Sequence, residues 1–440
     1  MAAVCVTRDG DDVMSGKISR GSRAIAYKGK YDLRVELLKN GFALALHKEG
    51  ARVSKIEFYR QLLYIGKTPV EVARIGGMSD EDHCETQFLQ TGEPEYFDTL
   101  IELSHRFLKE NDVSAVIAHG NRFLYGRANY VPCFYHAIVT IKTTQALAAR
   151  KQHTVRHFRD EDRPQVESLA GRFRRYHPRM LSHREIPDEN ITVVSGQRDE
   201  PLGYVRMMVQ PEPEEQAWWG KIYVTELGGA GPAAMETLLR AIGETAAEHN
   251  VKETYFPFSP FHPFSRLCMQ FGGTCLAMGP TNDPTKDEDM ALILDLGAFL
   301  RALCPEFERR LRHASATDWR GNIYLRTDDD LASIDVDGPD VQAGGVHDGT
   351  TMATMLAVPS KILTQLLTGF RSFLDIRDEP AVSYSVRNRE MLTALFPAVL
   401  PAAQGDFSLF RPQVRHRRRL SPAALKTIQS RSSKAARPGL

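Results

Sequence analysis

The order in which strand and helix patterns follow one another limits the possible folds of this chain more than any other feature. Three apolar or alternating runs, separated by short turns, predict consecutive antiparallel strands: GFALALHKEG (41–50), VSKIEFYRQLLYI (53–65) and TPVEVARIGGM (68–78). After a polar loop come a helix with Pro94 in its first turn, a strand, a short helix and a last strand (134–141). The order β-β-β-α-β-α-β predicts an α/β unit around a mixed sheet.

A similar order recurs in the next part of the chain. A strand over 153–158 and a helix with acidic residues at its start precede three strands between residues 191 and 229. The Gly-rich turn GGAGP (228–232) then leads into a helix with one apolar stripe, formed by Met235, Leu238, Leu239, Ile242 and Ala246. A strand and a short helix ending on paired glycines complete this unit. Two units with the same order of elements predict a duplication of the fold.

These units fit into a plan of five parts. The expected parts are a poorly ordered N-terminus (1–30), a first unit (31–150), a second unit (151–280), a small α+β domain (281–410) and a basic disordered tail (411–440). At the start of the first unit, YDLRVELLKNG (31–41) predicts a helix. TNDPTKDED (281–289) is a polar linker, and the domain after it combines three predicted strands with helices.

Charge is divided unevenly along the chain. From Arg411 to Leu440 there are nine Lys and Arg and no Asp or Glu; subtracting these nine charges from the whole-chain value of +1 leaves −8 for residues 1–410. A basic segment of this kind could engage nucleic acid, an acidic membrane surface or an acidic partner. It has no interleaved aromatic residues, so base stacking is not expected, and a solubilising tail is the preferred interpretation.

Composition favours a cytoplasmic globular protein. Hydrophobic residues make up 42% of the chain and charged residues 25%, as in ordinary folded proteins. The N-terminus is acidic where a secretory signal would be basic, and no run reaches the roughly 20 apolar residues of a membrane span. The six cysteines form no CxxC pair, which argues against a zinc site and for reduced thiols. No metal is predicted, because the HxxxH spacing of HTVRH (153–157) falls in a predicted strand.

Three phrases and the domain order carry a family resemblance. The phrases are IGGM (75–78) ahead of a polar loop, LYGRANY (124–130) and PFSPFHPFSRLCMQFGG (257–273). Over roughly residues 35–410 the chain resembles the acetyltransferases of the GNAT superfamily, in the branch related to the mycobacterial enhanced-intracellular-survival protein. The resemblance implies an α/β (α+β) fold class, with two tandem GNAT-like mixed-sheet units followed by a small sterol-carrier-like α+β domain.

The resemblance also implies an activity and a site. The expected reaction is transfer of an acetyl or longer acyl group from acetyl-CoA, or another acyl-CoA, to an amine of a small molecule or protein, and members often form oligomers. Tyr125 stands where the family has its general acid, which protonates the departing thiolate. The residues expected to hold the cofactor are Ile75, Gly76, Gly77 and Met78 on the third strand, Cys84, Thr86, Gln87 and Phe88 in the phosphate loop, and Asn121 at the end of the fifth strand.

Each of these assignments has a structural alternative. The two glycines can simply end a strand at a bulge, Tyr125 can be a packed aromatic residue, and Asn121 can serve packing. In the second unit, the Gly-rich turn before a helix lacks a basic residue and is usually structural. These alternatives remain open on the sequence.

The phosphate loop departs from the family pattern. That loop reads Arg-x-x-Gly-x-Gly/Ala in the family, whereas this chain has Cys84 in place of the arginine and Gln87 in place of the glycine. Three hypotheses follow: an acyl-CoA-dependent N-acetyltransferase, a catalytically degenerate GNAT-fold binding or assembly module whose CoA phosphate loop is lost, and, with less support, a lipid carrier based on the C-terminal domain. Acyl transfer is the prediction.

Overall fold

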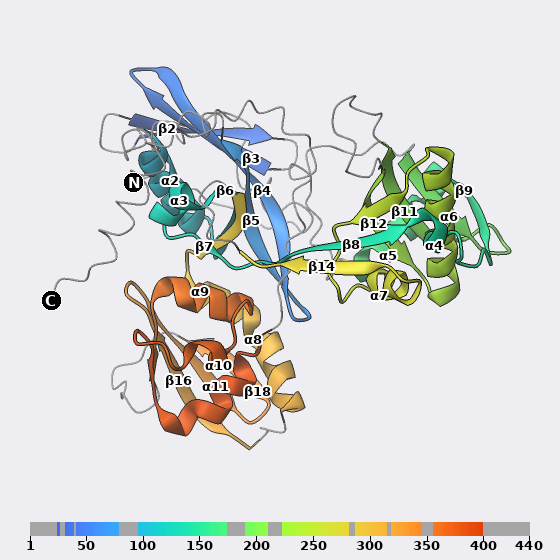
Figure 1. Cartoon of the computed structure of the whole chain (residues 1–440). Helices are drawn as coiled ribbons and strands as arrows, with labels where there is room; N and C mark the ends of the chain where they lie inside the picture. The colour runs from blue at the N-terminus through green and yellow to red at the C-terminus, as the bar shows by residue number, and fades with distance from the viewer. Residues whose placement is uncertain are drawn as a thin grey trace, which may run out of the picture.

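The computed structural model describes three sheets, each with its own helices (Figure 1). The described residues are 24–26, 31–38, 41–78, 96–173, 190–209, 222–280, 287–314, 318–344 and 355–398. None of the helices within these ranges is long and apolar enough to cross a membrane. The expected α/β (α+β) class is confirmed, because strands and helices both contribute substantially to every part.

The first sheet has eight strands in the order β1-β2-β3-β4-β5-β6-β15-β7. Their bounds are β1 Ala24–Ala26, β2 Tyr31–Leu38, β3 Gly41–Lys48, β4 Ala51–Ile65, β5 Thr68–Met78, β6 Ala115–Asn121, β7 Val131–Pro132 and β15 Asp287–Ile293. Helix α2 (Phe97–Glu110) connects the parallel pair β5 and β6, and α3 (Arg122–Arg127) follows β6. The three strands predicted between residues 41 and 78, and the helix after them, are confirmed.

The helix predicted over 31–41 is wrong. Residues Tyr31–Leu38 form β2, which pairs antiparallel with β3 along its whole length. Leu33 and Val35 are buried while their neighbours are partly or fully exposed, which is the period of two that a half-buried strand requires. Pairing with β3 therefore overrides the local helical pattern.

The second sheet has seven strands in the order β14-β8-β13-β12-β11-β10-β9. Their bounds are β8 His136–Lys142, β9 Thr154–His157, β10 Ile191–Ser195, β11 Pro201–Val209, β12 Ile222–Gly229, β13 Glu253–Phe256 and β14 Thr274–Met278. The helices are α4 Thr143–Ala146, η1 Asp160–Asp162, α5 Arg163–Phe173, α6 Pro232–Glu248 and α7 Pro263–Gln270. Strand β14 was not predicted from the sequence.

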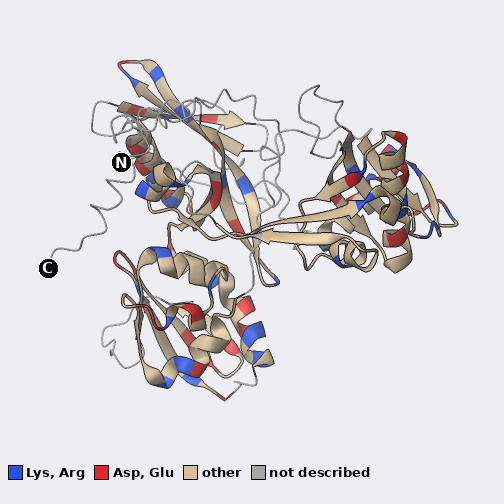
Figure 2. Cartoon of the chain, viewed as in Figure 1, with Lys and Arg blue, Asp and Glu red and all other residues tan. Residues whose placement is uncertain are grey.

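Two strands leave the unit in which the sequence places them. Strand β8, expected to close the first unit, pairs with β13 and β14 in the second sheet. In return β15, expected to open the C-terminal domain, pairs with β6 and β7 in the first sheet. Figure 1 shows β8 and β14 running side by side from the first unit to the second, and β14 carries no charged residue (Figure 2). The two units are therefore interlocked.

The third sheet has the order β18-β17-β16-β19-β20 and forms a small α+β domain. Its strands are β16 Arg320–Arg326, β17 Leu331–Asp337, β18 Asp340–Gly344, β19 Met355–Ala357 and β20 Ser383–Tyr384. Its helical segments are α8 Leu296–His313, α9 Ser360–Thr368, α10 Phe373–Ile376, η4 Val386–Asn388 and α11 Arg389–Leu395. As the sequence predicted, Ala332, Ile334 and Val336 of β17 are buried in its core.

This third domain packs directly against the first sheet. Leu63 and Val72 of the first sheet share one buried cluster with Leu300 and Phe307 of α8. Burying one such side chain contributes about 1.5–3 kcal/mol to the free energy of folding. Because the cluster is continuous across the junction, this burial holds the two parts together.

A buried carboxylate strengthens the same junction. Glu306 is fully buried on α8 and accepts bonds from Arg309 (2.5 Å), Arg310 (2.9 Å) and the Lys67 amide in the β4–β5 turn (3.1 Å). Burial alone would raise the pKa of Glu306, but these donors outweigh it and hold the pKa below its usual value. Gly66, at φ +62°, leaves room for the carboxylate, since a Cβ there would lie 2.0 Å from Oε1 of Glu306.

Candidate functional site

The two parallel strands at the centre of the first sheet separate after a short contact. Among the described residues, β5 and β6 pair only at Ala73 with Val116 and at Arg74 with Ile117. Beyond that point β5 pairs with β4 up to Met78, while β6 pairs with β15 up to Asn121. The strands thus diverge towards their C-terminal ends, where an open α/β sheet offers room for a ligand.

A β-bulge lies on β5 at the start of this gap. Phe58 pairs with Ile75 and Glu57 with Gly77, so Gly76 has no opposite residue on β4. Gly76 is exposed, Gly77 is half-buried, and Ile75 and Met78 are buried in the core. The four strand residues among those predicted to hold the cofactor therefore lie on the diverging end of β5. A bulge leaves one residue unpaired and turns its backbone N–H and C=O groups away from the neighbouring strand. Such groups can bind an extended ligand.

The two glycines differ in their surroundings. A Cβ on Gly76 would lie 1.9 Å from Cε2 of Tyr59, whereas a Cβ on Gly77 would have no atom within 4 Å. Tyr59 is buried and donates to Glu57 (2.5 Å); burial and this carboxylate raise the pKa of its phenol. Gly76 is thus required by packing, while the space beside Gly77 is open. The structural interpretation therefore holds for Gly76, and the cofactor role of Gly77 stays a prediction.

Tyr125 lies fully buried on α3, which follows β6 at the other side of the gap. Its ring packs edge-on against Phe97 of α2 and against Tyr130, each with ring centroids 5.4 Å apart. Tyr125 belongs to the same buried cluster as Ile75 and Met78, so the structure brings the predicted acid and the predicted cofactor strand to one core.

Tyr130 is held in turn by His105 of α2. The Oη of Tyr130 and Nε2 of His105 lie 3.0 Å apart. Burial lowers the pKa of His105 to about 4, so the imidazole is neutral at pH 7. The aromatic group around Tyr125 is therefore a closely packed arrangement without a charged member.

Asn121 has a clear structural task. As N-cap of α3, its Oδ1 accepts from the amides of Phe123 (2.9 Å) and Leu124 (3.0 Å). This cap begins the helix that carries Tyr125. The remaining predicted cofactor residues, Cys84, Thr86, Gln87 and Phe88, lie outside the described residues.

A partly buried histidine–aspartate pair, which the sequence did not predict, lies near the end of β6. Nδ1 of His119 is 3.1 Å from Oδ1 of Asp289, which is fully buried on the neighbouring β15. His119 alternates with Ala115 and Ile117, so it lies on the face of the sheet that the third domain covers. The Asp289 carboxylate orients the imidazole of His119, and imidazole is a common acceptor or donor of protons in enzymes. No local signal could reveal this pair, because its residues are 170 positions apart and meet only through β15.

The second unit repeats the geometry of the first. Strands β12 and β13 pair in parallel only at Tyr223 with Tyr255 among the described residues, and the register shift in β12 leaves Thr225 unopposed two residues later. In the first unit the bulge at Gly76 likewise comes two residues after the last paired residue, Arg74. The two sheets therefore share both the divergence and the bulge.

The Gly-rich turn of the second unit is packed. A Cβ on Gly228 would lie 2.9 Å from the Phe173 ring, and one on Gly229 would lie 3.1 Å from the sulfur of Met235. These contacts support the structural interpretation of GGAGP, in which Gly228 allows the close approach of α5 and Gly229 that of α6.

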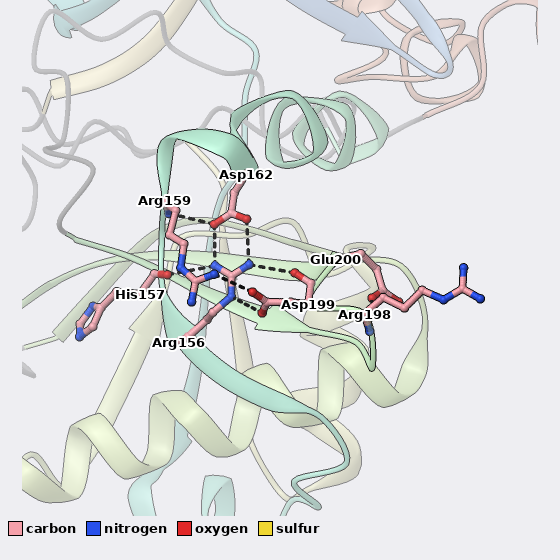
Figure 3. Close-up of polar contacts among 7 residues, drawn as sticks. All are labelled: Arg156, His157, Arg159, Asp162, Arg198, Asp199 and Glu200. Atoms are coloured by element: carbon pink, nitrogen blue, oxygen red, sulfur yellow. Dashed lines mark hydrogen bonds and ion pairs between the residues drawn. The ribbon is translucent and has the colours of Figure 1, made fainter.

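A charge network of the second unit is also structural (Figure 3). Arg156 of β9 donates to both oxygens of Asp162 (2.6 and 2.8 Å) and to Asp199 (2.7 Å), and Arg159 donates to the other oxygen of Asp199 (2.6 Å). Bonds from Arg156 are the largest cause that lowers the pKa of Asp162 and of Asp199. The network ties β9 to η1 and to the β10–β11 turn, away from both gaps.

Comparison with known proteins identifies the class of fold. No protein-family model matches the chain, and no curated protein sequence matches it either. Solved structures match it over most of their length, and the fold is that of the GCN5-related N-acetyltransferases.

Three of these solved structures illustrate the similarity. A conserved protein of Enterococcus faecalis V583 is 14% identical (82% of this chain, 87% of that chain, TM-score 0.61). A GCN5-related N-acetyltransferase of Anabaena variabilis is 12% identical (82% and 89%, TM-score 0.59). Eis1 of Mycobacterium abscessus is 15% identical (84% and 92%, TM-score 0.50).

Proposed function

We propose that the chain is an acyl-CoA-dependent N-acyltransferase of the tandem GNAT type, with acetyl-CoA as donor and an amine as acceptor. One observation carries the proposal: β5 has a bulge and diverges from β6, and the buried Tyr125 of α3 shares a core cluster with Ile75 and Met78 at the diverging end of β5. The third part of the chain is, in this proposal, the sterol-carrier-like domain of the enhanced-intracellular-survival branch.

The diverging end of β5 fits an acyl-CoA. A pantetheine arm needs free backbone N–H and C=O groups, and Ile75 to Met78 are not paired with β6. Gly77 offers space where a side chain would otherwise stand, since a Cβ there would meet nothing within 4 Å. Acetyl-CoA, when bound, supplies a reactive thioester. The residues of β5 would hold its arm.

Two groups on opposite faces of the sheet would then move the protons. His119, oriented by Asp289, would accept a proton from the attacking amine as the N–C bond forms. Tyr125 would donate its phenolic proton to the departing sulfur as the C–S bond breaks. Proton exchange with solvent would then deprotonate His119 and reprotonate Tyr125, which restores both groups. Phe97 and Tyr130 hold the Tyr125 ring in place.

The carboxylates of β15 have separate partners. Glu288 and Asp289 are both buried, and as consecutive strand residues they point to opposite faces of the sheet. Glu288 lies 4.0 Å from Arg122, and Asp289 lies beside His119. The proposed acceptor is therefore named only by its class, an amine of a small molecule or of a protein. We further propose a cytoplasmic location, where acyl-CoA is available, and a homo-oligomer as one state of assembly.

Calorimetry with acetyl-CoA and longer acyl-CoA, followed by thiol release with a panel of amines, tests this function. We expect saturable acyl-CoA binding and amine-dependent release of CoA. The Tyr125→Phe variant should lower kcat by about 10²- to 10⁴-fold, because it removes the acid but keeps the ring. Tyr204→Phe, which removes a phenol in the second unit that donates to Glu226 (2.9 Å), is the matched control. Unchanged turnover in Tyr125→Phe would show that another group is the acid.

A degenerate binding module is the second candidate. Cys84 and Gln87 stand where phosphate-binding Arg and Gly are expected, which favours loss of the CoA phosphate site. In that case calorimetry detects no heat from any acyl-CoA, while the fold and its thermal stability are unaffected by these ligands.

A further inference from the structure

We infer that helix α9 of the third domain is a positioning element for Tyr125, acting through Lys361 and Gln365; this inference rests on the proposed function. The two side chains are four residues apart and lie on one face of α9. Lys361 Nζ donates to the carbonyl of Gly126 (3.0 Å), and Gln365 Nε2 donates to the carbonyl of Pro132 (2.8 Å). One helix therefore bonds both ends of the segment 126–132.

This segment determines where the Tyr125 ring lies. Gly126 follows Tyr125 directly, and Tyr130, within the segment, packs edge-on against the same ring. The Gly126 carbonyl belongs to the last turn of α3, where a cation satisfies exposed carbonyls and complements the helix dipole. Lys361 thus places a cation at the C-terminal end of α3.

The first unit holds α3 from its opposite side. Arg127 of α3 pairs with Asp98 of α2 (2.6 Å), and Phe97 on the same helix packs against Tyr125. Helix α2 of the first unit and helix α9 of the third domain therefore both contact the segment that carries Tyr125. None of these contacts involves β5, so a change in α9 should affect the position of Tyr125 without affecting acyl-CoA binding.

The expected effect of losing both donors is kinetic. A misplacement of about 1 Å can lower a catalytic rate about 100-fold. Since α2 still holds one side, we expect the double variant Lys361→Met/Gln365→Leu to lower kcat by about tenfold. The KM and the Kd for acetyl-CoA should change by less than about twofold, because Ile75 to Met78 are not touched.

The test compares four full-length proteins: the unaltered chain, the double variant, Lys361→Arg and Arg312→Met. Lys361→Arg keeps a cationic donor and should retain kcat within about twofold, and Arg312→Met removes an exposed cation of α8 that pairs with Glu308 (3.0 Å) and should be neutral. Amide hydrogen exchange over residues 122–132 gives a second readout, which should be faster only in the double variant.

The outcomes separate this inference from the proposed function. If the unaltered chain transfers acyl groups and the double variant keeps both its kcat and its exchange protection, the positioning role is wrong and the function stands. If the double variant loses acetyl-CoA affinity and kcat together, the effect is general destabilisation and the positioning role is again wrong. If the unaltered chain transfers no acyl group to any amine, the proposed function fails and the positioning role fails with it.

Discussion

The two neighbouring glycines on β5 allow a sharp test of the bulge. In Gly76→Ala the new Cβ would lie 1.9 Å from Cε2 and 2.4 Å from Cδ2 of Tyr59, whereas carbon atoms normally approach to about 3.5–4.0 Å. The Tyr59 ring cannot retreat easily, because its hydroxyl is bonded to Glu57 and its other edge faces Gly41, where a Cβ would lie 2.7 Å from Cδ1. We expect Gly76→Ala to lower the free energy of unfolding by about 2–3 kcal/mol, at the upper end of the range for overpacked cores.

Gly77→Ala is the matched control for this substitution. The new Cβ of this variant meets no atom within 4 Å. The free energy of unfolding should therefore change by less than about 1 kcal/mol, through the lower conformational entropy of the unfolded chain alone. Urea unfolding followed by circular dichroism measures both, and acetyl-CoA calorimetry should show weaker binding for Gly76→Ala, whose bulge must move. In a Tyr59→Ala background the cost of Gly76→Ala should largely vanish, giving a coupling energy of about 2 kcal/mol. Equal stability of the two alanine variants would refute the steric argument.

Three further predictions concern stability. Glu306→Gln should cost about 3–5 kcal/mol in urea unfolding, because it leaves Arg310 buried without its charge partner, whereas the exposed Glu308→Gln should cost less than about 1 kcal/mol; equal costs would contradict the account of the junction. Burial lowers the pKa of His105 from 6.5 to about 4, so the unfolded chain binds the proton first as the pH falls. The free energy of unfolding should be unaffected by this group above pH 6.5 and should fall by about 3 kcal/mol between pH 6.5 and pH 4. His105→Gln should flatten this pH dependence, and an unchanged profile would disprove the account. Asn121→Ala should lower the free energy of unfolding by about 1 kcal/mol, whereas Asn121→Asp keeps the N-cap acceptor and should not. Unchanged stability of Asn121→Ala would show that the cap is dispensable.

Much of the first unit follows from local pattern. Alternating runs predicted β3, β4 and β5, and the apolar spacing after Pro94 predicted α2, because these elements bury one face at a fixed period. The position of Tyr125 on a short helix beyond a buried strand was likewise predicted. What Cys84 and Gln87 do stays a prediction, since both lie outside the described residues.

The sequence by itself determined the α/β class, the order of the three parts and the placement of Ile75 to Met78 at a strand end. Tertiary structure alone decided that β8 and β15 change sheets, that Tyr31–Leu38 is a strand, and that His119 meets Asp289. The physical reason is the sequence separation of the interacting residues. The spacing of apolar side chains within one helix or strand is local and can be read from its own residues. The neighbour of a strand, and the hydrogen-bond donor of a buried carboxylate, depend instead on pairing and burial between residues that are far apart in the chain.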